Sequence, residues 1–197
     1  MKNEMRSVIG SAAVIFLLAA TSLSGLRNGV AGELQSGNQL VANGSAAKTN
    51  KAKAVLESKS GSTLTGEVTF TEKQGGVEVN IKLKGAAPGP HGIHLHDKGD
   101  CSAADAASAG GHFNPDKTSH GAPDADPHHS GDLGNIIVGA KGTGELKLMV
   151  KGLTVADGAH SVVGHAFVVH ASADDFKSQP AGNSGARFAC GVVKAVN

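Results

Sequence analysis

Hydrophobic and polar residues alternate along most of the chain after residue 50, with a period of two residues. The clearest example is VEVNIKLK (77–84), where apolar residues alternate with charged or amide side chains. Such alternation is typical of a β-strand with one buried and one exposed face. The strand-like segment TLTGEVTF (63–70) precedes it, and EKQGG (72–76) between them predicts a glycine-containing hairpin connection.

Three later segments are also rich in strand-forming residues: GELKLMVKG (144–152), residues 162–170 and residues 188–196. No segment shows an apolar stripe with helical spacing over a convincing length, and no internal repeat is present in the sequence. The pattern therefore predicts an all-β fold, either a sandwich or a barrel.

One segment, residues 97–132, lacks this alternation and consists mainly of Gly, Ala, Ser, Asp, Pro and His. A loop of this length inside a compact domain is normally either disordered or functional. It contains four of the ten histidines of the chain. Because metal–ligand bonds can order a segment that has no hydrophobic core, we expect a metal ion to hold this loop.

The N-terminal segment has the pattern of a signal peptide. Lys2 and Arg6 precede the apolar run VIGSAAVIFLLAA (8–20), and small residues follow it. We predict a signal peptide over residues 1–31, with cleavage after Ser24 or after Ala31. A permanent membrane anchor is the alternative, but the apolar run is short for a membrane span. The mature protein is then exported, to the periplasm or the extracellular space, with no stable membrane span.

Residues 32–50 lack periodicity and are rich in Gly, Asn, Ser and Ala, which predicts a flexible linker before a domain at residues 51–197. The chain has 28 Gly, six Phe and neither Trp nor Tyr, so Val, Ile, Leu and Ala must fill its core. The formal net charge is +1, and removing the predicted signal peptide, whose net charge is +2, leaves about −1. This balance argues against a nucleic-acid partner, and any attraction for an anion must come from a local field.

The only two cysteines, Cys101 and Cys190, both lie in the predicted mature domain. In an exported chain an isolated pair is most simply a disulfide, although two soft metal ligands are the alternative.

The histidine spacing suggests ligands for metal ions. His94 and His96 are two residues apart, so on a strand both rings point to the same face, whereas His91 has the opposite parity. The long loop adds three histidines and the aspartate at its end, a closed tetrahedral set that suits zinc: His112, His120, His129 and Asp132. His170 ends the run HAFVVH and can project into the same region.

Five motifs together resemble the successive signatures of the Cu,Zn superoxide dismutase family, in the family's order: HGIHLH (91–96), GGHFNP (110–115), HSGDLGN (129–135), FVVH (167–170) and GARFACGVV (185–193). The resemblance implies a Greek-key barrel of eight antiparallel strands with two long functional loops. It also implies one copper and one zinc per chain and superoxide as substrate. The implied copper ligands are His94, His96, His112 and His170. The implied zinc ligands are His112, His120, His129 and Asp132, with His112 bridging the two ions.

Further roles follow from the same resemblance. Arg187 matches the arginine that attracts and orients superoxide, and Cys101 and Cys190 match the family's disulfide. Asp174 matches the aspartate that links a copper histidine to a zinc histidine, with the adjacent Asp175 as its rival. His91 matches a histidine that packs near the site without binding metal.

Several points stay open at this stage. His128 is the rival of His129, while His160 and His165 have no assigned role. The long interval between Cys101 and His112 resembles the bacterial exported branch of the family. The segment before Arg187 has a single lysine, which leaves the strength of substrate steering undetermined, and the resemblance does not settle the oligomeric state.

The sequence also admits two non-enzymatic alternatives. One is a periplasmic buffer or carrier of copper and zinc with the same fold, and the other is a structural domain stabilised by zinc alone. The complete copper ligand set together with Arg187 favours the enzyme over both.

Overall fold

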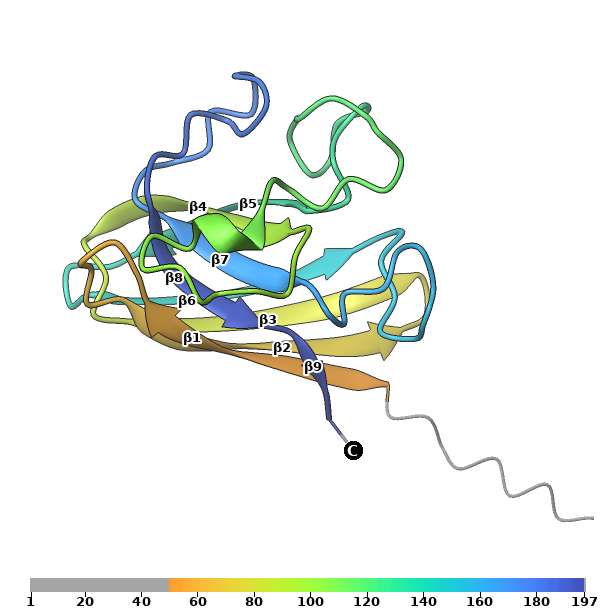
Figure 1. Ribbon diagram of the computed structural model, residues 1–197, viewed down its shortest axis with the longest axis horizontal. Helices are drawn as coiled ribbons and strands as arrows, with labels where there is room; N and C mark the ends of the chain where they lie inside the picture. The colour runs from red at the N-terminus through yellow and green to blue at the C-terminus, as the bar shows by residue number, and fades with distance from the viewer. Residues whose placement is uncertain (1–49, 197) are drawn as a thin grey trace, which may run out of the picture. The chain divides into compact units, whose positions relative to one another are not determined.

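The alternating segments of the sequence form antiparallel strands in the computed structural model, which describes residues 50–196 (Figure 1). Within this range the strands are β1 (Lys51–Ser58), β2 (Thr65–Lys73), β3 (Gly76–Lys84), β4 (Gly89–His96), β5 (Asp132–Val138), β6 (Thr143–Val150), β7 (Ala166–His170), β8 (Arg187–Val192) and β9 (Lys194–Ala195). A single turn of 3-10 helix, η1 (Ala107–Ala109), interrupts the connection between β4 and β5. The predicted signal peptide and nearly all of the predicted linker lie outside the described residues.

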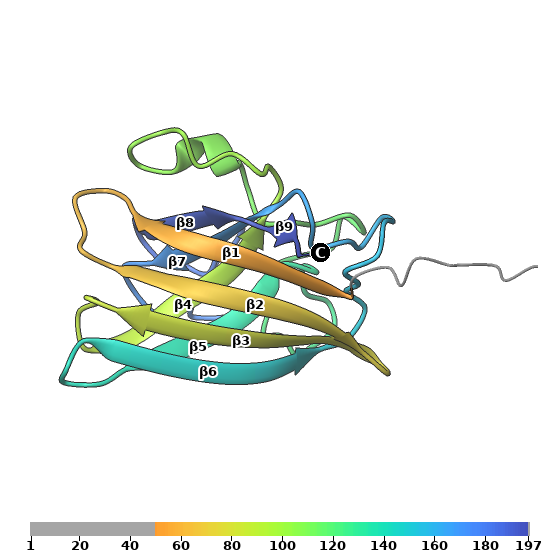
Figure 2. The ribbon, with the colours of Figure 1, turned by 90° about the horizontal axis from the view of Figure 1, so that it is seen from below.

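The strands form a nearly closed barrel with Greek-key connectivity. They are hydrogen-bonded in the order β5-β4-β7-β8-β1-β2-β3-β6, and β9 pairs with β1. The pairs β3–β6 and β4–β7 join strands that are not consecutive in the chain, as a Greek key requires. Figure 2 shows β1, β2, β3 and β6 in one layer and the remaining long strands behind them. The predicted barrel of eight antiparallel strands is confirmed, and the two-residue β9 was not predicted.

Apolar side chains from the inner faces of the two layers form the core. On β3 the buried residues are every second one, Val77, Val79, Ile81 and Leu83, each at most 4% exposed. Each such burial stabilises the fold by about 1.5–3 kcal/mol. The rings of Phe70 and Phe167 meet edge-to-face in this core, with centroids 6.3 Å apart. The alternation in the sequence therefore identified the inward-facing side of this strand.

β4 and β7 differ from this pattern because both of their faces are buried. Every residue from 91 to 96 is buried, and Ile93 and Leu95 belong to the core. On the outer side of β7, Ala166 and Val168 pack against alanines of the β4–β5 connection. This connection therefore covers the part of the barrel wall that carries the histidine motifs.

Three long connections leave the barrel. The β4–β5 loop (residues 97–131) matches the segment without alternation in the sequence, and the β7–β8 loop (residues 171–186) lies at the same side of the barrel (Figure 1). The third connection, residues 151–165, is longer than the sequence predicted. It contains Val162, which was expected in a strand, because the chain turns at Gly164 (φ 87°) before β7 begins. None of the helices in residues 50–196 has the length and apolar character of a membrane span.

Candidate metal centre

Four histidines form the first group of candidate metal ligands. His94 and His96 lie on the outer face of β4, and His170 ends the neighbouring strand β7. His112 comes from the β4–β5 loop and forms an isolated bridge with His96. One ring nitrogen from each of the four lies within 4.8 Å of the others, and all four residues have buried ligand atoms. Strand register therefore places three of these rings, and one backbone bridge adds the fourth.

The second group surrounds the carboxylate of Asp132, the first residue of β5. Its Oδ1 lies 2.8 Å from His112 Nδ1, 3.0 Å from His120 Nδ1 and 3.3 Å from His129 Nδ1. Its Oδ2 accepts hydrogen bonds from the N–H groups of His129 and Gly121. Three imidazoles from the loop thus converge on one carboxylate oxygen at the start of β5.

His112 belongs to both groups. Its Nδ1 faces Asp132 in the second group, and its Nε2 is buried without a hydrogen-bond partner. The ring also stacks on His94, with centroids 3.9 Å apart. A single imidazole therefore presents one nitrogen to each group, which is the geometry needed to bridge two ions.

Three buried ring nitrogens have no hydrogen-bond partner among the described residues: His94 Nδ1, His112 Nε2 and His120 Nδ1. A buried polar atom left without a partner destabilises a protein by about 1–3 kcal/mol. All three atoms point into the two groups, so bound metal ions would satisfy them. The all-imidazole group suits copper, and the three imidazoles with one carboxylate suit a closed zinc site.

The second nitrogen of several of these rings is bonded to the protein, which fixes the tautomer and the ring orientation. His96 Nδ1 lies 2.9 Å from the carbonyl oxygen of Gly110, and His170 Nδ1 lies 3.2 Å from that of Gly185. A carbonyl oxygen can only accept a hydrogen bond, so Nδ1 of both rings carries the proton. Nε2 of both rings therefore carries the free lone pair. The first group is therefore arranged to offer lone pairs to a cation.

Asp174, in the β7–β8 loop, connects the two groups through its carboxylate. Its Oδ2 lies 2.7 Å from His94 Nε2, and its Oδ1 lies 3.0 Å from His120 Nε2. The rival Asp175 is exposed and instead accepts hydrogen bonds from backbone N–H groups of its own loop. The structure thus separates two adjacent carboxylates that the sequence alone left open.

The remaining histidines lie outside both groups. His128 was the rival of His129, but its Nδ1 lies 2.7 Å from the carbonyl oxygen of His129. His91 is buried beneath the end of β7, where its Nδ1 lies 2.8 Å from the carbonyl oxygen of His170. His160 and His165 bond to Asp116 and to the backbone of residue 97, respectively.

Burial decides the charge state of three histidines of the first group, His94, His96 and His170. Burial lowers the pKa of His94 and His96 well below its ordinary value, and the neighbouring His112 adds to the effect. Burial also lowers the pKa of His170 to about 4. Burial alone would raise the pKa of Asp132, but hydrogen bonds from His112 and two backbone N–H groups outweigh it, so this pKa lies below its usual value. At neutral pH these three histidines are therefore neutral and Asp132 is anionic. These are the forms that bind metals.

Arg187, the first residue of β8, holds the β4–β5 loop next to the first group. Its guanidinium donates hydrogen bonds to the carbonyl oxygens of Ala106 and Gly110, each at 2.7 Å. The Gly110 carbonyl also faces His96 Nδ1, so one carbonyl connects the arginine to a ring of the group. Burial lowers the pKa of Arg187, but an arginine remains protonated at neutral pH. Arg187 therefore supplies a fixed positive charge beside the first group.

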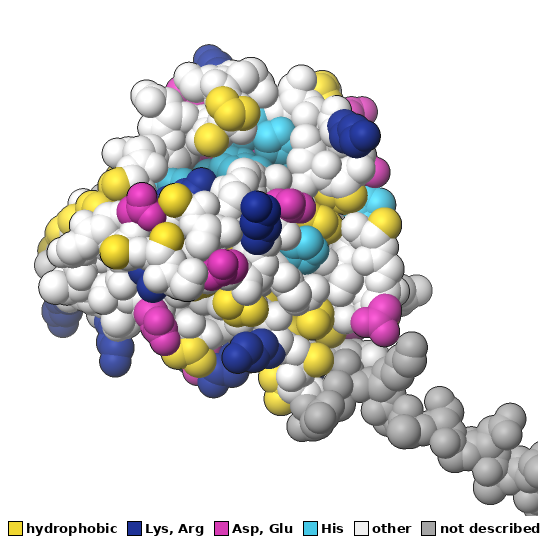
Figure 3. All heavy atoms as spheres, in the orientation of Figure 1, with side chains coloured by type: hydrophobic (Ala, Val, Ile, Leu, Met, Phe, Trp, Pro, Cys, Tyr) yellow, Lys and Arg dark blue, Asp and Glu magenta, His cyan; other side chains and the backbone are white. Residues whose placement is uncertain are grey.

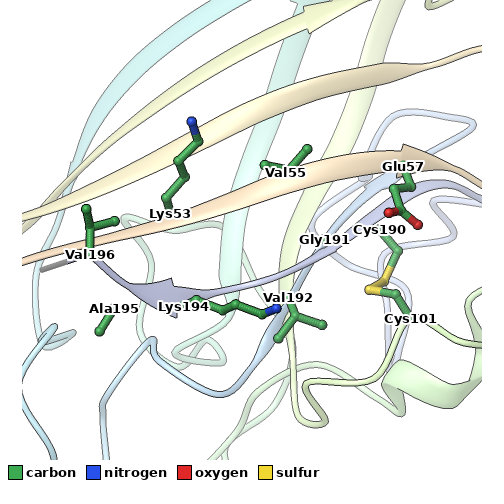
Figure 4. A pocket seen from close by; sticks show the side chains of 10 residues that line it. All are labelled: Lys53, Val55, Glu57, Cys101, Cys190, Gly191, Val192, Lys194, Ala195 and Val196. Carbon is green, nitrogen blue, oxygen red and sulfur yellow. A yellow bond between two sulfur atoms is a disulfide. The ribbon is translucent and has the colours of Figure 1, made fainter.

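Cys101 and Cys190 form a disulfide, with their Cα atoms 5.8 Å apart, as the resemblance implied. Cys190 lies in β8, so this bond attaches the start of the β4–β5 loop to the barrel and excludes the two cysteines as metal ligands. A groove beside the disulfide is lined by side chains such as Lys53 and Lys194 (Figure 4) and by none of the candidate metal ligands. Figure 3 shows histidine side chains in a recess on the face turned to the viewer.

One residue of the site was missed from the sequence. Asn135 on β5 holds the backbone of Asp174 from both sides: its Oδ1 accepts from the Asp174 N–H at 2.7 Å, and its Nδ2 donates to the Asp174 carbonyl at 2.9 Å. Its place at the end of HSGDLGN (129–135) was the available signal, but a lone asparagine in a strand has no chemical signature.

Comparison with known proteins defines the class to which this fold and site belong. Residues 64–193 match the family of copper/zinc superoxide dismutases (SODC), which is more than half of the chain. The chain belongs to this family. It is also similar to a solved structure of the clock protein EA4, with 36% sequence identity and a TM-score of 0.69. That match covers 76% of this chain and 96% of the other.

Proposed function

We propose that this protein is a superoxide dismutase that uses one copper and one zinc ion per chain and acts outside the cytoplasm. Two superoxide anions and two protons are converted to dioxygen and hydrogen peroxide. The observation that carries the proposal is His112, a single ring shared between an all-imidazole group and a zinc-type group. A site that only stores one kind of ion needs no such shared ring.

The residues divide the work between the two groups. Bound copper supplies the one-electron chemistry, because imidazole ligands tolerate both of its oxidation states. The closed set of three histidines and Asp132 leaves no open position, so it suits a structural zinc. His112 Nε2 is the atom at which a proton can be held whenever that nitrogen is not bound to an ion. Asp174 holds the rings of His94 and His120 in fixed orientation through its two carboxylate oxygens.

Arg187 attracts and orients the anionic substrate. The mature chain has a net charge of about −1, so attraction must come from a local field. The Arg187 guanidinium lies beside the first group, because it donates to the same Gly110 carbonyl oxygen that faces His96 Nδ1. Because a clock protein shares this fold, the proposal rests on these site residues and not on the barrel itself.

The predicted signal peptide and the disulfide support action in an oxidising compartment, the periplasm or the extracellular space. The long interval between Cys101 and His112 supports membership of the bacterial exported branch. Export is tested separately, by locating the mature chain in fractionated cells and sequencing its N-terminus, which begins at residue 25 or 32 if a signal peptidase acts as predicted.

The deciding experiment measures superoxide decay by the mature protein loaded with copper and zinc, together with its metal content. We expect fast turnover at about one copper and one zinc per chain, lost on extraction of copper and restored by returning it. Both metals without turnover would instead favour a metal buffer or carrier. Zinc without copper would favour a structural domain.

A further inference from the structure

The side-chain amide of Gln179 binds the backbone of His120, a residue of the second metal group. Its Oε1 accepts a hydrogen bond from the His120 N–H at 2.9 Å, and its Nε2 donates to the His120 carbonyl oxygen at 2.9 Å. Within residues 50–196 these are the only hydrogen bonds made by the peptide N–H and carbonyl of His120. The carboxamide therefore satisfies both backbone groups of His120, as the backbone of a neighbouring strand does for a residue in a sheet.

His120 needs such a partner because no regular element contains it. It lies in the β4–β5 loop, eight residues after His112 and nine before His129. Its ring is oriented by Asp174, which contacts Nε2 and leaves Nδ1 to face the second group. A ring contact fixes the direction of the imidazole, but the distance of Nδ1 from the ion also depends on where the backbone lies. The two hydrogen bonds from Gln179 act on the position of the His120 backbone.

The β7–β8 loop holds Asp174 and Gln179 in one compact turn. The carboxylate of Asp175 accepts hydrogen bonds from the N–H groups of residues 177 and 178, and the N–H of Gly182 donates to the Ser178 carbonyl. Gly182 has a φ of +64°, and a Cβ there would lie 1.9 Å from Asp174 Oδ1 and 2.7 Å from His120 Nε2. The turn can approach His120 this closely only with glycine at that position.

We propose that Gln179 is a positioning residue of the zinc site: its two hydrogen bonds hold the backbone of His120 while Asp174 holds the ring. This inference rests on the proposed function, since it assumes that the second group binds zinc. It predicts an asymmetric effect, because no hydrogen bond joins Gln179 to the histidines of the first group among the described residues. Loss of the carboxamide weakens zinc retention and leaves copper binding largely intact.

The test compares Gln179→Met with the wild type. Methionine keeps the length of the side chain and removes both hydrogen bonds to His120, together with the longer one, 3.4 Å, from Gln179 Nε2 to the Lys177 carbonyl oxygen. A packing role alone would be preserved. The matched control is Gln74→Met, which changes an exposed glutamine in the β2–β3 turn. The first measurement is the rate of zinc release to a chromophoric chelator from the copper- and zinc-loaded protein. We expect release about 10-fold or more faster in Gln179→Met, and unchanged in Gln74→Met.

Gln179→Glu separates position from charge. The carboxylate still accepts from the His120 N–H but cannot donate to the His120 carbonyl. Its negative charge by itself would retain a cation more strongly. We therefore expect faster zinc release from this variant than from the wild type, whereas slower release would overturn the inference.

Two further readouts report on geometry and not on stability. Cobalt substituted for zinc gives a visible absorption spectrum that depends on ligand arrangement, and we expect it to shift in Gln179→Met with copper content unchanged. In the wild type the His120 amide should exchange with solvent at least about 10-fold more slowly than in Gln179→Met, and fast exchange in the wild type would remove the basis of the inference even if the variant did not fold.

The outcomes distinguish this inference from the proposed function. Equal zinc release and equal cobalt spectra in wild type and Gln179→Met would overturn the role of Gln179 and leave the dismutase proposal standing. A wild-type chain that takes up no zinc would overturn the proposed zinc site and the inference with it.

Discussion

The two metal groups differ in what holds their side chains. Three members of the first group are carried by paired strands: His94 and His96 on β4 and His170 on β7. In the second group the three histidines come from the β4–β5 loop, and only Asp132 belongs to a strand, as its first residue. The first group is thus placed by hydrogen-bonded backbone, and the second by a segment with almost no regular structure.

The difference teaches how a barrel that contains neither Trp nor Tyr can support a precise site. Strand register positions the first group once the sheet has formed. The loop needs separate attachments, which here are the disulfide to β8, the two carbonyl contacts of Arg187 and the contact of Asp174 with His120. Metal binding should therefore add more order to the loop-held group than to the strand-held group.

The largest expected effect comes from the strand-held group. His94→Ala removes one of its four imidazoles, and we expect superoxide turnover to be abolished while the β-sheet circular dichroism is retained. Turnover and copper content would be measured after incubation with both metals. His160→Ala, which removes a half-exposed imidazole outside both groups, is the control and should keep wild-type turnover. Full activity of His94→Ala with copper supplied would refute the assignment of this group.

The corresponding change in the loop-held group is Asp132→Ala. We expect the affinity for zinc to fall by about 100-fold or more, because the change removes a ligand and the acceptor of two backbone N–H groups. Limited proteolysis should cut residues 97–131 faster than in the wild type. Asp116→Ala removes an exposed carboxylate from the same loop and should change neither result. Unaltered zinc affinity in Asp132→Ala would contradict the assignment.

A smaller effect is expected beside the first group, at Arg187. Arg187→Ala should lower the second-order rate by about 10- to 100-fold, with both metals retained and a weaker dependence on ionic strength. Lys177→Ala, in the neighbouring loop, tests whether the single lysine there contributes, and we expect a lesser decrease. A rate for Arg187→Ala equal to that of the wild type would show that the copper site attracts the anion unaided.

A separate effect concerns the stability of the metal-free protein in acid and not its activity. The pKa of His170 is lowered from 6.5 to about 4, so between these values the unfolded chain binds a proton that the folded chain does not. The free energy of unfolding should therefore decrease as the pH falls from about 6.5 to about 4, by roughly 3 kcal/mol from this group. Urea unfolding at several pH values measures it. The slope should be shallower in His170→Asn, and a free energy independent of pH would be incompatible with a buried neutral ring.

Much of the fold could be predicted from local pattern. Alternation located β3 and β6, and the segment without alternation predicted the β4–β5 loop. The reason is that successive side chains of a strand point to opposite faces, so buried and exposed residues alternate in the sequence. β7 was predicted four residues too long, since a run of β-branched residues cannot show that the backbone turns at Gly164. The two-residue β9 also escaped prediction, because its pairing with β1 depends on a distant strand.

For the site, the residue types and spacing were sufficient to name the candidate ligands, because imidazole and carboxylate chemistry is a property of the side chain itself. The motif order narrowed the choice between neighbours such as His128 and His129. What no pattern in the sequence contained was the set of contacts between loops. Asn135 and Gln179 are ordinary amides along the chain, and only folding brings each against the backbone of the residue that it holds.

The sequence by itself thus determined the β architecture, the inventory of metal-binding side chains and the two cysteines. The tertiary structure decided which nitrogen of each ring faces which group, which of Asp174 and Asp175 joins them, and how the loops are attached. The physical reason is the distance along the chain over which each property is determined. Burial periodicity and ligand chemistry depend only on a residue and its neighbours. Hydrogen bonds between segments dozens of residues apart depend on where the whole chain places them.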